Sequence, residues 1–372
     1  DETKGYVFIE GGTINITSGE DGIQAETQAL IKDGNITINS GGGSEKSTKL
    51  KSGNGNMPGE EMRERPDMPS QDMNGNMGER PEMPDKDMNV NMSEKLEMSD
   101  ENSSENTETI SKKAIKASSN IIIEGGNIKI DSCDDSIHSN NSIKINGGTM
   151  NISSGEDGIH SDSELTINGG NIKVSKSYEG IESEVININD GSIHVTASDD
   201  GINVSEANSE SSVDTNSGQH ESNESLKAQI NINGGYVYVD SNGDGLDSNG
   251  NVNMKDGTVI VNGSTNNGNG SLDYDGTFDI SGGTLIAAGS AGMAQTPSSS
   301  SSQKTINISL TSQEANTIVN VQSEDGKDIL NFAPAKAYQS VVVSTSNIKS
   351  NGEYSVYVGG SSTGKSTDGL YS

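Results

Sequence analysis

A segment of about 22 residues recurs along the chain, and it constrains the fold more than any other feature. Its copies share a Gly-Gly or Asp-Gly pair, a short alternating stretch, and an acidic turn before an isolated Ile or Leu, as in "INGGTMNISSGEDGI". The spacing from Asp135 to Asp157 is 22 residues, from Asp157 to Glu179 it is 22, and from Glu179 to Asp200 it is 21. A fixed period of this length is the signature of a repeat architecture, in which each unit packs on its neighbours.

The pattern inside each repeat predicts strands. Apolar and polar residues alternate over four to five positions, which is typical of half-buried strands, and the glycines allow tight corners. We therefore predict an all-β chain that forms a right-handed parallel β-helix of about nine coils. A β-sandwich would not keep the period, and the nine-residue Gly-Asp repeat of a calcium β-roll is absent. Two inward columns are expected, the first being Ile14, Ile128, Met150, Ile172, Ile193 and Val237, and the second Ile23, Ile137, Ile159, Ile181, Ile202 and Leu246.

Composition shifts divide the chain into parts. We predict the β-helix over residues 1–295, a linker at 296–304 and a cap of antiparallel strands at 305–372, which would cover the open edge of the last coil. Insertions at 42–111 and 205–226 interrupt the period. The first holds nine of the twelve methionines among Pro, Asn and charged residues. We expect it to have little structure of its own, with soft-metal binding or oxidant scavenging as the functional alternative.

The charge balance excludes one class of function and favours another. Asp and Glu number 55 against 24 Lys and Arg, so the formal net charge is −31. Such a chain does not suit nucleic acid, because phosphate recognition needs clustered cations, but it suits cation binding. The single cysteine, Cys133, excludes an internal disulfide, and no apolar run reaches 18 residues. We expect an extracellular or cell-surface bacterial protein, and because the sequence opens inside a repeat, we expect upstream residues to have been removed by secretion or processing.

The acidic turns predict two columns on one surface, since equivalent positions of successive coils stack. Carboxylates stacked about 4.8 Å apart repel one another, and either raised pKa values or a bound cation relieves the repulsion. Carboxylate and carbonyl oxygens favour calcium, while the alternative is that Asp before Gly serves turn geometry alone. The first column is Asp21, Asp135, Asp157, Glu179, Asp200 and Asp244, and the second is Gln24, His138, His160, Glu182, Asn203 and Asp247. The candidate calcium ligands are Glu179, Glu182, Asp199, Asp200, Asp244, Asp247, Asp157 and Asp135. Two histidines are few for a zinc site, so turn hydrogen bonds are the expected role of His138 and His160.

The chain resembles a known family through the segments "KGYVFIEGGTINITSGEDGIQAE", "SYEGIESEVININDGSI" and "VIVNGSTNNGNGSLDYDG". It is similar to the secreted clostridial carbohydrate-binding β-helix proteins, which bind cellulose and acidic plant sugars on a pectate-lyase-like fold. The resemblance extends over nearly all of the chain outside the insertions. It implies calcium-dependent binding of a plant cell-wall polysaccharide, either cellulose or a pectin-like acidic sugar. The residues expected to contact the sugar are Tyr178, Tyr274, His138, His160 and Asp273.

Two other functions stay open. A polysaccharide lyase acting on uronates would need calcium and an Arg or Lys base. The three arginines, Arg63, Arg65 and Arg80, all fall in the first insertion, so we favour a binding protein over an enzyme and assign no catalytic residue. The third function is structural, in which an uncapped first coil pairs with a second copy to form a homo-oligomer or a head-to-tail filament. The sequence does not identify the polysaccharide or the number of ions.

Overall fold

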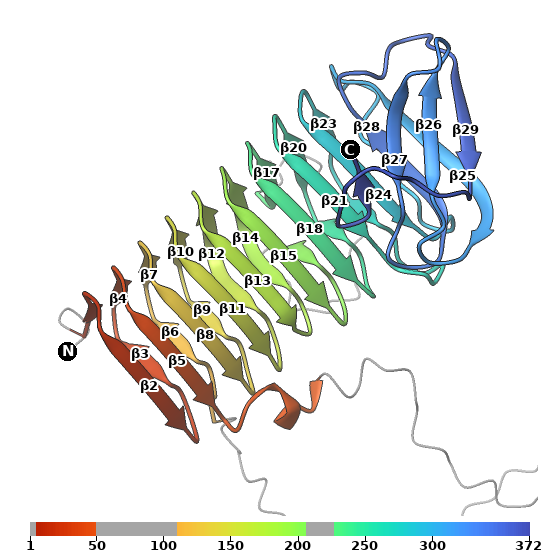
Figure 1. Ribbon diagram of the computed structural model, residues 1–372. Helices are drawn as coiled ribbons and strands as arrows, with labels where there is room; N and C mark the ends of the chain where they lie inside the picture. The colour runs from red at the N-terminus through yellow and green to blue at the C-terminus, as the bar shows by residue number, and fades with distance from the viewer. Residues whose placement is uncertain (1–4, 50–109, 206–226) are drawn as a thin grey trace, which may run out of the picture. The chain divides into compact units, whose positions relative to one another are not determined.

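The computed structural model describes residues 5–49, 110–205 and 227–372, which belong to one compact unit. The described residues form β-strands joined by turns, together with one short 3-10 helix, η1 (Ser44–Lys46). Most of the two insertions lies outside these ranges. Among the described residues there is no helix with the length and apolar character needed to cross a membrane. The predicted all-β fold is confirmed, and the strands stack in chain order as successive rungs (Figure 1).

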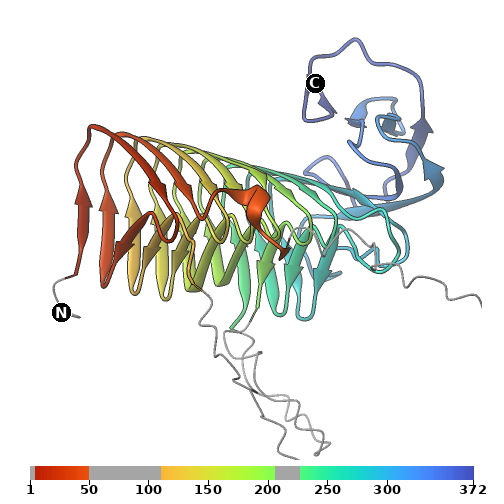
Figure 2. The same cartoon turned by 90° about the horizontal axis from the view of Figure 1, so that it is seen from below.

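Three parallel ladders, two of nine strands and one of eight, build a β-solenoid of about nine turns, which confirms the predicted number of coils. Ladder 1 contains β1 (Val7–Ile9), β4 (Gln28–Ile31), β7 (Asn120–Ile123), β10 (Ser142–Ile145), the second halves of β12 (Ile159–Ile167) and β14 (Ile181–Ile188), β17 (Gln229–Ile232), β20 (Asn251–Met254) and β23 (Phe278–Ile280). Ladder 2 contains β2 (Thr13–Ser18), β5 (Asn35–Ser40), β8 (Asn127–Ser132), β11 (Thr149–Ser154), β13 (Asn171–Lys176), β15 (Ser192–Ala197), β18 (Tyr236–Ser241), β21 (Thr258–Asn262) and β24 (Thr284–Gly289). Ladder 3 contains β3 (Ile23–Ala25), β6 (Ile115–Ala117), β9 (Ile137–Ser139), the first halves of β12 and β14, β16 (Ile202–Val204), β19 (Leu246–Ser248) and β22 (Leu272–Tyr274). Each coil passes through ladders 1, 2 and 3 in that order (Figure 2).

The core is a set of stacked aliphatic side chains. In ladder 1, Ile121 pairs with Ile143, which in turn pairs with Leu165, and all three are fully buried. Burying a side chain of this size contributes about 1.5–3 kcal/mol, and the column repeats this contribution in every coil. Both predicted inward columns are buried, apart from Ile14 in the first coil, which is half-buried against the same core.

A column of glycines sets the corner between ladders 1 and 2. At this corner, the second residue of the Gly-Gly or Asp-Gly pair has a positive φ, for example +97° at Gly148 and +102° at Gly170. A Cβ atom on Gly148 would lie 2.9 Å from the carbonyl oxygen of Gly126 in the preceding coil. Glycine is therefore required both by backbone conformation and by the close approach of successive coils.

One coil is a residue shorter than the coil before it, and a β-bulge accommodates the difference. Ile159 pairs with Ile181, 22 residues on, whereas Glu164 pairs with Val185, only 21 residues on. The register shift lies between Ser161 and Glu164, in the middle of β12. A β-bulge inserts one residue without moving the flanking pairs to the opposite face, so the inward columns continue across it.

Both insertions leave the solenoid at turns and do not disturb the pairing. The first lies between β5 and β6, yet Ile23 of β3 still pairs with Ile115 of β6. The second lies between β16 and β17, and Ile186 still pairs with Ile230. The positions of the acidic turns therefore stay in line along the whole stack.

The C-terminal strands close the last coil and also cover part of an outer face. Ladder 2 is extended by two antiparallel strands, β28 (Tyr338–Ser344) on β24 and then β25 (Thr305–Gln313). A further antiparallel sheet has the order β29 (Tyr354–Val358), β26 (Val319–Ser323), β27 (Asp328–Phe332), β31 (Leu370–Tyr371) and β30 (Ser366–Thr367). Its buried side chains form one cluster with Ile260 and Ile286, which point outward from ladder 2. Along β23, the hydroxyls of Ser298 and Ser301 accept hydrogen bonds from the backbone N–H groups of Phe278 and Ile280, both at 3.0 Å.

Adjacent isoleucines on β7 give a matched test of the inward column. Ile121 is fully buried, whereas Ile122 points outward and is half-buried. We expect Ile121→Ala to lower the free energy of unfolding by about 2–5 kcal/mol, because it removes apolar contacts and leaves a cavity. Ile122→Ala should lower it by less than about 1 kcal/mol. Urea unfolding measures both, and equal losses would contradict the assignment of the two faces.

Candidate functional site

The acidic turns lie between ladders 2 and 3, and the register of ladder 3 confirms that they stack. His160 pairs with His138 on one side and with Glu182 on the other. Continuing along the ladder, Glu182 pairs with Asn203 and Asn203 with Asp247. The pairing also adds two members to the second column that we had not predicted there, Lys116 next to His138 and Asp273 next to Asp247. The second column is thus Gln24, Lys116, His138, His160, Glu182, Asn203, Asp247 and Asp273.

Most aspartates of the first column tie successive coils together with one carboxylate oxygen. Asp135 Oδ1 accepts a hydrogen bond from the backbone N–H of Asp157 at 3.1 Å, and Asp200 Oδ1 accepts one from Asp244 at 2.6 Å. Asp21 and Asp244 accept the corresponding bonds from Lys113 and Gly270. Turn geometry and ligand binding are therefore compatible at these aspartates, since Oδ1 serves the turn and Oδ2 remains for other partners.

Lysines neutralise the N-terminal end of the columns. Lys113 occupies the first-column position between Asp21 and Asp135, and its Nζ lies 2.5 Å from Asp135 Oδ2 and 3.0 Å from Asp134 Oδ1. Lys116 lies 3.7 Å from Asp21 Oδ2. Burial opposes ionisation of Lys113, but the attraction of Asp135 and Asp134 is larger and holds the Lys113 pKa above its usual range. The stretch "KKAIK" that follows the insertion aligns with "EDGIH" of another coil, and this alignment would have revealed both lysines.

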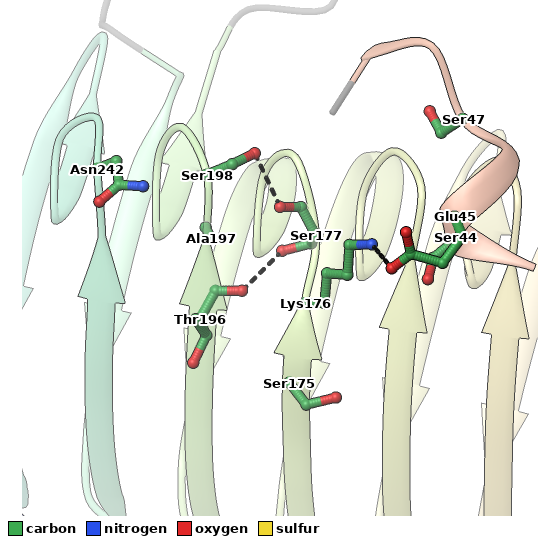
Figure 3. Close-up of a pocket in the computed structure, with 10 residues that line it drawn as sticks. All are labelled: Ser44, Glu45, Ser47, Ser175, Lys176, Ser177, Thr196, Ala197, Ser198 and Asn242. Atoms are coloured by element: carbon green, nitrogen blue, oxygen red, sulfur yellow. Dashed lines mark hydrogen bonds and ion pairs between the residues drawn. The ribbon is translucent and has the colours of Figure 1, made fainter. Parts of the chain in front are cut away.

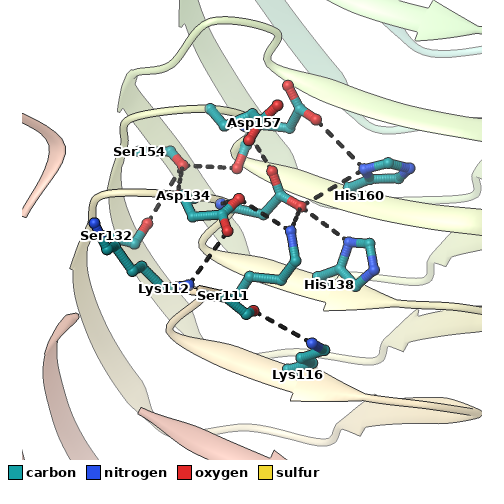
Figure 4. Close-up of polar contacts among 12 residues, drawn as sticks. Ser111, Lys112, Lys116, Ser132, Asp134, His138, Ser154, Asp157 and His160 are labelled. Carbon is teal, nitrogen blue, oxygen red and sulfur yellow. Dashed lines mark hydrogen bonds and ion pairs between the residues drawn. The ribbon is translucent and has the colours of Figure 1, made fainter. Parts of the chain in front are cut away.

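Histidines and carboxylates share a groove of about 470 Å³ in the middle of the columns. Figure 4 shows His138 and His160 on adjacent rungs beside Asp157. Their ring centroids lie 4.8 Å apart, and the two rings meet edge to face. His160 Nδ1 lies 3.4 Å from Asp157 Oδ2, 3.7 Å from Asp135 Oδ2 and 3.8 Å from Glu182 Oε2. These carboxylates outweigh the opposing effect of burial and raise the pKa of His160 to about 11.

At the C-terminal end of the columns, the described residues place no Lys, Arg or His in an ion pair with the acidic cluster. Asp200, Asp244 and Asp247 each offer an oxygen within 4.8 Å of the others. No Lys, Arg or His among the described residues forms an ion pair with any of the three. Burial, together with the neighbouring carboxylates, raises the pKa values of Asp200 and Asp247 to about 7. Burial and Glu182 likewise raise the pKa of Glu179 to about 7.

The other predicted residues lie at different places. Glu179 and Glu182 line the groove with Asp135, Asp157 and both histidines, whereas Asp199 precedes Asp200 in the next coil. Tyr178 lies under Lys49, whose Nζ is 4.9 Å from the ring centroid, and a hydrogen bond with Asp199 raises the Tyr178 pKa to about 12.

The structure does not bring Tyr274 and Tyr178 together. The Tyr274 hydroxyl donates to the Thr296 carbonyl at 2.6 Å, and its ring packs edge-on against Phe278. Asp273 accepts a hydrogen bond from the Gln295 amide at 2.5 Å.

A second cavity, of about 300 Å³, was not found by sequence reasoning. It lies where η1 covers the turns after β13 and β15, and hydroxyl side chains dominate its lining (Figure 3). Lys176 pairs with Glu45 at its edge, and the Ser198 hydroxyl donates to the Ser177 carbonyl at 3.0 Å. Serines at or just after the ends of most ladder 2 strands were the sequence signal for this lining, but serine in a turn is too common to be diagnostic.

The raised pKa values predict an inverted pH dependence for the metal-free protein. Asp200 and Asp247 rise from 3.8 to about 7, and Glu179 rises from 4.5 to about 7. Between about pH 4 and 7 the folded chain therefore binds more protons than the unfolded chain, so stability falls as pH rises. In EDTA we expect Tm to drop by several degrees from pH 5 to pH 8, at about 2–4 °C per kcal/mol. Asp247→Asn should reduce the drop and Asp279→Asn, on the exposed side of β23, should not. A Tm that rises over this range would contradict the prediction.

Comparison with known proteins now adds the family. A family model described as "Carbohydrate-binding domain-containing protein" matches residues 1–158 and 156–221, which together cover more than half of the 372-residue chain. No curated protein and no solved structure matches significantly. The matched region contains ladder 3 from β3 to β16 and the groove with both histidines. The resemblance to clostridial carbohydrate-binding β-helix proteins is confirmed, and the protein belongs to this carbohydrate-binding domain-containing family.

Proposed function

We propose that this protein binds acidic polysaccharides outside the bacterial cell, through calcium ions held by its acidic columns. The observation that carries the proposal is the cluster of Asp200, Asp244 and Asp247, whose ligand atoms lie within 4.8 Å of one another. All three side chains offer oxygen only, and calcium prefers six to eight oxygen ligands, including backbone carbonyls and water.

Electrostatics supports a cation at this cluster. The raised pKa values of Asp200 and Asp247 reflect burial together with carboxylates that repel one another. A divalent ion removes this repulsion without a proton, so binding to the folded state would also stabilise it. Asp273 follows Asp247 in the second column and offers a further carboxylate one coil away.

The charge of the protein favours an acidic sugar bridged by the ion. With a net charge of −31, the chain would repel a uronate polymer unless a cation lay between them. Flat neutral glucans are usually recognised by rows of aromatic rings. In the described part of the chain, Tyr274 packs inward and Tyr236 and Tyr238 lie against the C-terminal cluster. A calcium-bridged, pectin-like polysaccharide is therefore the better fit than cellulose.

The residues that line the groove do not favour the alternative function, a polysaccharide lyase. Lys49 and Lys113 both line it, together with Glu179 and Glu182. Carboxylates outweigh burial and hold the pKa of each lysine above its usual range, so neither amine is a good base at neutral pH. The three arginines lie outside the described residues.

Calcium and sugar binding can be measured on matched variants. We expect calorimetric calcium binding to the wild type, with the affinity reduced at least tenfold, about 1.4 kcal/mol, in Asp244→Asn and Asp247→Asn. Asp279→Asn, which removes a carboxylate outside the columns, should bind as the wild type does. Affinity electrophoresis in polygalacturonate should show retardation with calcium and none with EDTA.

Three results would count against the proposal. Retardation that persists in EDTA would exclude a bridging ion. Unchanged calcium affinity in both cluster variants would place the ion elsewhere. Retention on cellulose that equals retention on polygalacturonate, with or without calcium, would indicate a neutral-glucan surface instead.

A further inference from the structure

The histidine groove differs in chemistry from the oxygen-only cluster of Asp200, Asp244 and Asp247. Two triads of possible ligands meet there and share His160, one with Asp157 and Glu182 and the other with Asp135 and His138. Within each triad the ligand atoms lie within 4.8 Å of one another. The groove therefore gathers two imidazoles from adjacent rungs among several carboxylates.

Asp157 departs from the pattern of the other first-column aspartates. Asp21, Asp135, Asp200 and Asp244 each use Oδ1 to accept a backbone N–H from the following coil. Asp157 Oδ1 is buried and has no hydrogen-bond partner, and the whole residue is only 3% exposed. A buried carboxylate oxygen without a partner is destabilising, and a bound cation would remove that cost.

His138 contacts a different carboxylate of the groove. Its Nδ1 is buried and lies 2.9 Å from Asp135 Oδ2. Asp135 Oδ2 also lies 2.5 Å from Lys113 Nζ, so this carboxylate is shared between the imidazole and the lysine. Asp157 therefore brings the unpartnered oxygen to the groove, next to His160 and Glu182.

We propose that this groove is a zinc site, with His160, Asp157 and Glu182 as its protein ligands and water completing the coordination. Imidazole nitrogen selects zinc and other transition metals over calcium and magnesium, and carboxylates complete such sites. Bonds of about 2.0–2.1 Å place tetrahedral ligand atoms roughly 3.3 Å apart. His160 Nδ1 is 3.4 Å from Asp157 Oδ2 and 3.8 Å from Glu182 Oε2, so small side-chain rotations suffice.

A purely structural role for the histidines explains less. An imidazolium on His160 would neutralise part of the surrounding charge, but Asp157 Oδ1 would still lack a partner. The zinc site is also separate from the proposed calcium cluster, because the two share no ligand. The two ions can therefore be tested independently, and failure of one leaves the other standing.

The test is zinc titration of the full chain at neutral pH by calorimetry, with Co²⁺ as a spectroscopic substitute. We expect one equivalent bound in this groove, with the affinity reduced at least tenfold in His160→Gln and in Glu182→Gln. His194→Gln is the matched control, since His194 lies on β15 and contacts Asp368 instead. It should bind as the wild type does, and so should Asp247→Asn. The Co²⁺ complex should show the visible absorption of a tetrahedral site, and 1 mM calcium should displace less than half of the zinc.

Several results would overturn the site. These are no zinc binding by the wild type, the same affinity in the His160 and Glu182 variants as in the wild type, or full displacement by calcium. Circular dichroism in EDTA establishes whether each variant is folded. If His160→Gln does not fold, Glu182→Gln and the wild-type Co²⁺ spectrum still decide, because an ion bound elsewhere would leave the affinity of Glu182→Gln unchanged.

Discussion

In-register pairing between coils is the constraint on which everything else in this structure depends. Backbone hydrogen bonds fix each coil one strand spacing, about 4.8 Å, from the next, so every side chain meets its own equivalent. For isoleucine the consequence is a continuous core, as in the run from Ile121 through Ile143 to Leu165. For aspartate it is a row of charges that the fold itself cannot separate. The same geometry therefore stabilises the interior and creates electrostatic repulsion on one surface.

That repulsion is relieved differently along the stack. At the N-terminal end, Lys113 and Lys116 occupy the positions in the two columns that acidic, histidine or amide side chains occupy in the other coils. In the middle, His160 is surrounded by carboxylates of three coils. At the C-terminal end, the described residues supply no cation to Asp200, Asp244 or Asp247, and the pKa values of Asp200 and Asp247 rise to about 7. Along the stack of described coils, neutralisation by side-chain cations therefore gives way to carboxylates that repel one another and have raised pKa values.

Much of this arrangement could be predicted, because in a repeat fold the residues at equivalent positions of successive copies lie next to one another in space. The period and the spacing of Ile159 and Ile181 were enough to predict the coils and the stacking of the acidic turns. The lysines of the second coil were missed, because the turn "KKAI" after the insertion carries no acid and so does not resemble the acidic turns of the other coils. The packing of the C-terminal sheet on ladder 2 was also missed, although outward apolar residues at Ile260 and Ile286 break the alternation and mark a covered face. Asp157 Oδ1 has no partner because it lacks the hydrogen bond to the next coil that the other aspartates make, and no sequence pattern predicts that absence.

The closure of the last coil has a consequence for self-association. Strand β28 occupies the edge of β24, and the hydroxyls of Ser298 and Ser301 take the N–H groups of β23. A second chain therefore finds no free edge on these two strands at this end of the solenoid. Polymerisation by coil-on-coil addition needs two complementary open ends in each subunit. With the edges of β23 and β24 already occupied, a coil added at this end would lack two of the three strand pairings that join successive coils in the described chain.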